Sequence, residues 1–163
     1  MQLQKYSFHD FVGKFPPVKM PVTLGEDSHH AFSTENEPLS EGMIQQFIQI
    51  TDPEPTEDEF TEYLPCFAID DTPSFIALVW WKASLLNYEY VLATFTAKGV
   101  LISRKVIAQT RVVDAKVLHS VAVINEDWEI FVAEGASPDG NLLFDPTASR
   151  TFEMEILANG EIS

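Results

Sequence analysis

The chain has 163 residues, 45% of them hydrophobic and 21% charged, and a formal net charge of −15 at pH 7. This length and apolar content are enough to bury the core of one domain over residues 1–163, and they exclude intrinsic disorder. The longest apolar run, Phe75–Trp81, is seven residues long, whereas a membrane-spanning helix needs about 20. Because the N-terminus also lacks an apolar signal segment and Cys66 is the only cysteine, we expect a soluble, cytoplasmic protein with no membrane partner.

Charge is distributed unevenly along the chain. Between Met20 and Trp81 there are 13 acidic residues and no Lys or Arg, whereas Lys82–Lys116 holds 6 basic and 2 acidic residues. Phosphate binding needs a net basic face, so nucleic acid is excluded as a partner class. A basic protein is an electrostatically favourable partner, although acidity also serves solubility by itself.

The first 62 residues predict a helical and irregular layer. Ser7 is a typical N-cap of a short amphipathic helix that should end at Pro16-Pro17. Its apolar residues recur at helical spacing: Phe8, Phe11, Val12 and Phe15. A short extended segment is expected at Val18–Leu24, and a second helix at Glu41–Ile50. The acidic, proline-containing segment Thr51–Glu62 then reads as a solvated connector.

Residues 63–163 predict an antiparallel β meander. Seven segments are rich in β-branched and aromatic residues: Tyr63–Asp70, Ser74–Ala83, Tyr88–Ala97, Val100–Gln109, Ala115–Ile124, Trp128–Glu134 and Thr151–Leu157. Short turn signals separate them, among them Lys98-Gly99, Ser137–Asn141 and Asn159-Gly160. We therefore predict a β-dominated α+β fold: six to seven antiparallel strands in a curved sheet or partly open barrel, with one or two short N-terminal helices.

The segment Ser74–Ala83 is apolar on both faces. Trp80 and Trp81 are adjacent, so in a strand they point to opposite sides of the sheet. One face of this strand must then be covered by something other than the main core, either the N-terminal helices or a second copy of the chain. We favour the helices, because their aromatic residues need burial too.

A set of aromatic residues is the best candidate for a ligand or partner surface. It comprises Trp80, Trp81, Tyr88, Tyr90 and Trp128. Their number exceeds what one thin core face requires, and such side chains are enriched at interfaces. Ordinary core packing is the alternative interpretation.

The segment Glu26–His30 is the best candidate for a metal site. If it is extended, Asp27 and His29 share one face, while His30 lies on the other. Carboxylate and imidazole suit Zn²⁺, but these ligands leave the site incomplete. An exposed polar turn without stoichiometric metal is therefore expected. Cys66 should be a small buried hydrophobe rather than a nucleophile, since no neighbouring base is evident.

Two parts of the chain carry a resemblance. They are the opening Phe15-Pro16-Pro17 with Met20-Pro21, and the hairpin formed by Tyr90–Phe95 and Lys98–Ile102. Together with the general layout they resemble small uncharacterised bacterial domains of unknown function. This resemblance implies an antiparallel meander, and it does not indicate any activity.

No sequence motif of catalysis, nucleotide binding or cofactor binding is present. We therefore expect a protein that needs no cofactor and is not an enzyme, namely a binding or protein-interaction module. Its partner would be a basic protein or a second copy of the chain. Two alternatives stay open: an immunity-type inhibitor of a basic toxin, and a hydrolase that uses carboxylates or a metal near Glu26–His30.

Overall fold

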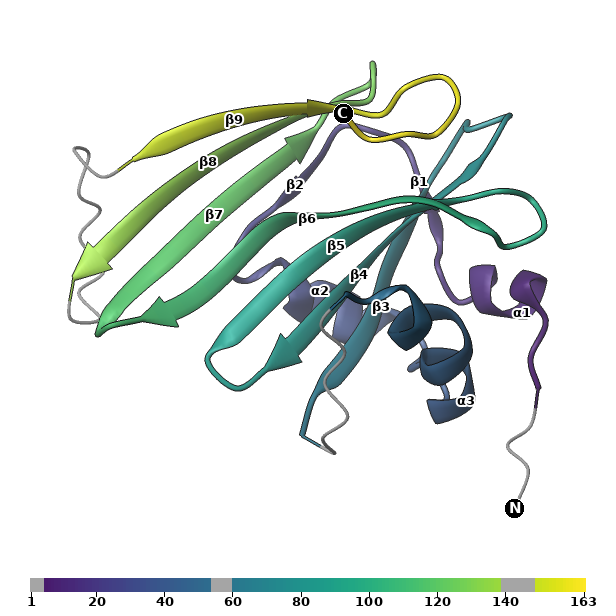
Figure 1. Ribbon diagram of the computed structural model, residues 1–163, viewed down its shortest axis with the longest axis horizontal. Helices are drawn as coiled ribbons and strands as arrows, with labels where there is room; N and C mark the ends of the chain where they lie inside the picture. Colours follow the sequence, from purple (N-terminus) through teal and green to yellow (C-terminus); the bar gives the residue numbers. More distant parts are fainter. Residues whose placement is uncertain (1–4, 54–59, 139–148) are drawn as a thin grey trace.

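A long, open antiparallel sheet dominates the computed structural model, which describes residues 5–53, 60–138 and 149–163 (Figure 1). Within these ranges the sheet has nine strands in the order β1-β3-β4-β5-β6-β7-β8-β9, and β2 pairs with β7. The strands are β1 (Pro17–Val18), β2 (Val22–Leu24), β3 (Glu62–Ile69), β4 (Ile76–Ser84), β5 (Asn87–Phe95), β6 (Leu101–Val113), β7 (Lys116–Ile124), β8 (Glu129–Pro138) and β9 (Arg150–Glu155). The β-dominated α+β prediction is confirmed. Two short strands, β1 and β2, join the seven expected ones, and β1 pairs with β3 in parallel.

The sheet divides where β6 and β7 part. These strands pair only near their shared turn, as far as Thr110↔His119. Beyond that pair, β6 continues along β5 and β7 continues along β8. The vacated edge of β7 is taken by β2, which pairs with the last three residues of β7. The halves β3–β6 and β7–β9 therefore diverge, with β2 between them (Figure 1).

Two apolar clusters hold the fold together. The first fills the space between the diverging halves of the sheet, and its buried members include Leu24, Phe67, Phe75, Val79, Leu92, Ile107, Ile124 and Ile130. The second lies on the other side of β3–β5, beneath the N-terminal layer, and includes Phe11, Phe15, Met43, Ile48, Leu78, Trp80 and Phe95. Strand β4 is thus covered on both faces within one chain, which confirms the two-sided pattern and the preference for helical cover.

The helices of the N-terminal layer are short. Helix α1 (Phe8–Val12) begins at Ser7, whose hydroxyl accepts a hydrogen bond from the Asp10 amide at 3.0 Å. It ends at Gly13, before the prolines that were expected to end it. The second expected helix is present as three consecutive turns, α3 (Glu41–Met43), the π-helical η1 (Ile44–Ile48) and the 3₁₀-helical η2 (Gln49–Thr51). No helix within the described ranges is long and apolar enough to cross a membrane.

Helix α2 (Ser28–Glu35) is the main departure from expectation. The extended conformation considered for Glu26–His30 is wrong, because the chain turns into a helix at Ser28. No residue of α2 is fully buried. Its sequence accordingly lacks the clear apolar stripe by which a helix is recognised. Tertiary contacts hold it instead. The Asn36 side chain donates to the backbone oxygens of Pro65 and Cys66 at 2.7 and 2.8 Å, which fixes the end of α2 on β3.

Two of the predicted tight turns, at Lys98-Gly99 and Asn159-Gly160, are confirmed. Lys98-Gly99 lies at the tip of the β5–β6 hairpin, and Gly99 and Gly160 both adopt a positive φ. The predicted turn at Ser137–Asn141 is wrong at its start, because Ser137 and Pro138 still belong to β8, and its residues from 139 onward lie outside the described ones. Residues 54–59 of the expected solvated connector lie outside them as well. The first part of this connector is not fully solvated, because Asp52 is buried.

Candidate functional site

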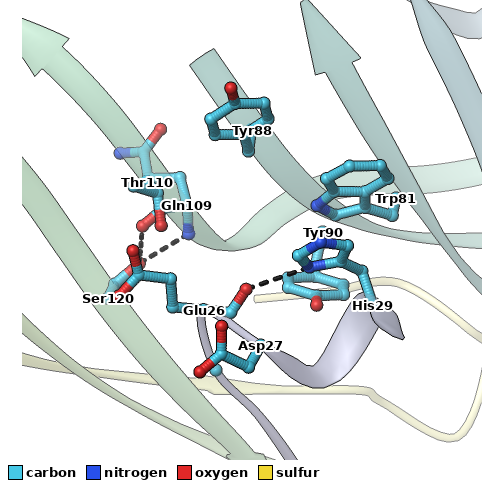
Figure 2. A pocket seen from close by; sticks show the side chains of 10 residues that line it. Glu26, Asp27, His29, Trp81, Tyr88, Tyr90, Gln109, Thr110 and Ser120 are labelled. Carbon is cyan, nitrogen blue, oxygen red and sulfur yellow. Dashed lines mark hydrogen bonds between the residues drawn. The ribbon is translucent and has the colours of Figure 1, made fainter. Parts of the chain in front are cut away.

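A cleft of about 350 Å³ opens where β6 and β7 part (Figure 2). Six segments line it: the turn between β2 and α2, the first turn of α2, β4, β5, and the parts of β6 and β7 where these two strands separate. The lining residues are Gly25, Glu26, Asp27, His29, Trp81, Tyr88, Tyr90, Gln109, Thr110 and Ser120. The cleft therefore exists because the strands diverge and β2 carries the start of α2 into the gap.

Three parallel rings form one wall of the cleft. The His29 imidazole stacks on the Trp81 indole, with 4.3 Å between ring centroids and 3° between planes. On the adjoining strand the Tyr88 ring is also parallel to Trp81, at 5.8 Å and 8°. Tyr90 lies next to them on the same face of β5 (Figure 2). Alternate residues of a strand share a face, which is why Tyr88 and Tyr90 both reach the cleft.

The orientation of His29 is fixed by its own turn. Its Nδ1 donates a hydrogen bond to the backbone oxygen of Glu26 at 2.9 Å, so Nδ1 carries the proton in the neutral ring. Burial, and then the charge of neighbouring His30, lower the pKa of His29 from its ordinary value of 6.5. At neutral pH the ring is therefore an uncharged aromatic surface, and it adds no positive charge to the cleft.

The charged residues of the cleft are acidic. Glu26 and Asp27 lie at its lip, and their side chains are 59% and 90% exposed. The Glu26 carboxylate is 3.7 Å from His119 Nδ1, and Asp27 is 3.9 Å from His30 Nε2. None of the lining residues is Lys or Arg. The mouth of the cleft is thus an exposed anionic edge beside an aromatic wall.

The opposite wall is fixed by one side chain. Ser120 Oγ accepts a hydrogen bond from the Gln109 amide at 2.7 Å and donates to the Gln109 carbonyl at 3.3 Å. Gln109 is the first residue of β6 beyond the last pair with β7, so it has no partner on that strand, although it still pairs with Glu89 of β5. The serine hydroxyl takes the place of the missing partner on β7.

Tyr90 is buried at the base of the cleft. The residue is 4% exposed, and its phenol oxygen lies beside Ser28 and the backbone of His29. Within the described ranges this oxygen makes no hydrogen bond of good geometry. Burial raises the pKa of the phenol above its ordinary value, so Tyr90 remains neutral throughout the physiological range.

The structure brings together three of the five predicted aromatic residues, Trp81, Tyr88 and Tyr90. Trp80 is fully buried on the opposite face of β4, under the N-terminal layer. Trp128 lies in the β7–β8 turn, away from the cleft, where it meets Phe75 edge-on at 5.3 Å. Trp80 and Trp81 point to opposite faces of the sheet because successive side chains of a strand alternate. Trp128 packs against a different part of the core, at Phe75.

The three predicted metal ligands lie at the start of α2. His29 faces the cleft, whereas the Asp27 and His30 side chains are largely exposed, at 90% and 72%. Among the described residues no group of three or more His, Cys, Asp or Glu side chains is placed to hold a metal ion. Cys66 is fully buried on β3, and burial raises the pKa of its thiol well above the ordinary value.

Comparisons with protein-family models, with curated proteins and with solved structures found no significant match. The functional argument therefore rests on the geometry of the cleft.

Several cleft residues were not singled out from the sequence. Gln109, Thr110 and Ser120 are ordinary strand residues in the pattern, and nothing local shows that β6 and β7 separate beside them. Glu26 was considered only as the first residue of the candidate metal segment Glu26–His30. A signal was nevertheless present in the sequence: the break Gly25-Glu26-Asp27-Ser28 follows a short apolar strand, and Asp and Ser are typical of helix starts.

Proposed function

We propose that the chain is a non-catalytic binding module that takes a small organic ligand into the cleft between β6 and β7. The observation that supports it is the convergence of a His29–Trp81–Tyr88 ring stack with Glu26, Gln109 and Thr110 on one cavity of about 350 Å³. Ligand sites typically have this size, and they combine aromatic walls with a few convergent polar groups.

The hydrolase alternative, which would use carboxylates or a metal near Glu26–His30, has less support from the geometry. Among the described residues no group of three or more His, Cys, Asp or Glu side chains is placed to hold a metal ion, and the carboxylates of Glu26 and Asp27 are largely exposed. Other nucleophiles are not favoured either. The Ser120 hydroxyl is occupied by the backbone of Gln109, and the buried Cys66 thiol does not line the cleft. A nucleophile needs an adjacent base and access to substrate. The lining residues therefore suit recognition better than covalent chemistry.

The immunity-type inhibitor is the second candidate. It is favoured by the exposed carboxylates of Glu26 and Asp27 at the lip of the cleft and by the net charge of −15. Such an inhibitor would receive a basic side chain of its target at this edge, since complementary charge speeds encounter and sets orientation. The same cleft would then serve a protein ligand.

The binding function can be tested by screening a chemically diverse small-molecule library for thermal stabilisation, followed by titration calorimetry of the hits. A ligand that binds only the native state raises the melting temperature, because it stabilises that state by RT ln(1 + [L]/Kd). We expect Trp81→Leu to abolish the stabilisation. The matched control Phe131→Leu, which alters a half-exposed ring on β8, should retain it. A library without any binder, or hits unaffected by Trp81→Leu, would refute the proposal.

A further inference from the structure

The chemistry of the cleft also selects the kind of ligand. Resting on the proposed binding function, we infer that the group bound in the cleft is an alkylammonium cation, held between the aromatic wall and the carboxylates of Glu26 and Asp27. The charge of the lining, the nature of the rings and the arrangement of the carboxylates each bear on this inference.

The sign of the ligand's charge follows from the lining. Glu26 and Asp27 contribute two negative charges, and no Lys or Arg lines the cleft. The nearest basic residue of β4, Lys82, lies on the opposite face of the sheet, where its ammonium is buried against Asp52 at 2.6 Å. The chain as a whole is acidic too, with a net charge of −15, although its segment Lys82–Lys116 is net basic. An anion would therefore meet uncompensated repulsion, whereas a cation is attracted both locally and at a distance.

The aromatic wall favours an organic cation over an inorganic one. Indole and phenol rings attract a cation placed within about 6 Å of the ring, and Trp is the strongest of them. The Tyr88 side of the stack is the open side: Tyr88 is 44% exposed, whereas His29 covers Trp81 at 4.3 Å. Methyl or methylene groups on the nitrogen would bury apolar surface on these rings, which a hydrated metal ion would not do.

The carboxylates also argue against a metal ion. Glu26 and Asp27 are largely solvated, and each already has an imidazole nearby at 3.7 and 3.9 Å. Within the described ranges no third His, Cys, Asp or Glu completes a metal cluster with them. Solvated carboxylates at the lip are suited to attract a diffuse organic charge, without the close coordination that a bare divalent ion requires.

The test compares two probes of nearly the same shape by titration calorimetry at pH 7.5 and low salt. Choline carries a quaternary nitrogen, and 3,3-dimethyl-1-butanol has a carbon atom in its place. We expect choline to bind at least about tenfold more tightly than the neutral alcohol, which is the order of effect that one cation–π contact supplies. The double variant Glu26→Gln/Asp27→Asn should reduce this difference, because it removes the share of choline binding that the carboxylates supply.

Two further variants distinguish the effect of the cleft carboxylates from that of overall charge, and test the aromatic wall. The double variant Glu153→Gln/Glu161→Gln removes the same charge from exposed positions outside the cleft, and it should bind choline like the unmodified protein. A Trp81→Leu variant should weaken choline more than it weakens the alcohol. Equal weakening by the two charge variants would show that only the overall charge matters, and would overturn the inference.

The two proposals fail in different ways. If the alcohol binds as tightly as choline, or if only neutral or anionic library members bind, the cation inference is wrong and the binding module stands. If neither the probes nor any library member bind, the binding function itself fails. A peptide bearing lysine or Nε-trimethyllysine supplies the same group from a protein. Peptide binding about tenfold tighter than choline would assign the cation to a protein side chain, and tighter choline binding would assign it to a free amine.

Discussion

Ser120 bridges the point where two strands of one sheet separate, because its hydroxyl bonds both the N–H and the C=O of Gln109, at 2.7 and 3.3 Å. The side chain thereby ends the β6–β7 ladder without leaving buried backbone groups unpaired. This is the same position at which the cleft begins.

Ser120→Ala should therefore destabilise the protein by about 1–3 kcal/mol, the usual cost of leaving a buried polar group unsatisfied. Urea denaturation measures the change. Ser33→Ala, on the exposed surface of α2, is the control and should change the stability little, although its hydroxyl donates to a backbone oxygen. A neutral Ser120→Ala would mean that water or a relaxed backbone can replace the hydroxyl.

The buried charges beneath the N-terminal layer should respond unequally to mutation. Asp52 Oδ2 lies 2.6 Å from Lys82 Nζ and 3.6 Å from an Arg104 nitrogen, and the three side chains are at most 11% exposed. Asp52→Ala removes the carboxylate that Lys82 and Arg104 share and should cost about 3–5 kcal/mol.

Lys82→Met should cost less, because Asp52 keeps its contact with Arg104 and the methionine fills the space of the lysine stem. Comparing the two variants by urea denaturation tests this order. A larger loss for Lys82→Met would show that the lysine, rather than the aspartate, is the centre of the network.

The titration of His29 should be displaced to low pH. Its folded pKa is lowered from 6.5 by burial and by His30, so the unfolded chain binds a proton more readily than the folded one. The contribution of His29 to stability is then complete above pH 6.5, and it is lost as the pH falls from 6.5 through the folded pKa.

NMR titration of the imidazole resonances measures this pKa directly. We expect a midpoint below 6.5 in the intact protein, and a higher one in His30→Gln, which removes the second cause. A midpoint above 6.5 in the intact protein would show that stacking on Trp81 favours the charged ring more than burial disfavours it.

Cys66 should resist thiol reagents in the folded protein. Its side chain is fully buried and its Sγ donates to the Leu64 carbonyl at 3.7 Å, while burial raises the pKa of the thiol. Little thiolate exists at pH 8, and the reagent has no direct access to it. Labelling with a chromogenic disulfide should be slow in buffer and rapid in denaturant. Stoichiometric native labelling within seconds would contradict the burial.

The sheet was predictable from the sequence because its signals are local. Alternating β-branched and aromatic residues, separated by turns such as Lys98-Gly99, specify strands one at a time. The two-sided burial of β4 also followed, since Trp80 and Trp81 are adjacent. Of the cleft, the sequence indicated Trp81, Tyr88 and Tyr90, which stand out by their size.

The rest of the cleft depends on contacts between distant segments. Helix α2 has no fully buried residue, and Asn36 holds its end on β3. No apolar periodicity in the sequence therefore indicates this helix. Where β6 separates from β7, β2 pairs with β7 instead, and no local pattern in β6 indicates that separation. Gln109, Thr110 and Ser120 consequently read as ordinary strand residues.

The pairing of β2 with β7 has a consequence for folding kinetics. The two strands lie roughly 100 residues apart in sequence, and contacts of such separation slow folding because a long loop must close before they form. The hairpins β3–β8 can assemble from neighbouring segments, whereas β2 and the attached turn Gly25–His29 must wait for β7. We therefore expect the cleft to be among the last parts of the molecule to form. A ligand would then bind only to chains that have finished folding. It would slow their unfolding without speeding the formation of the sheet.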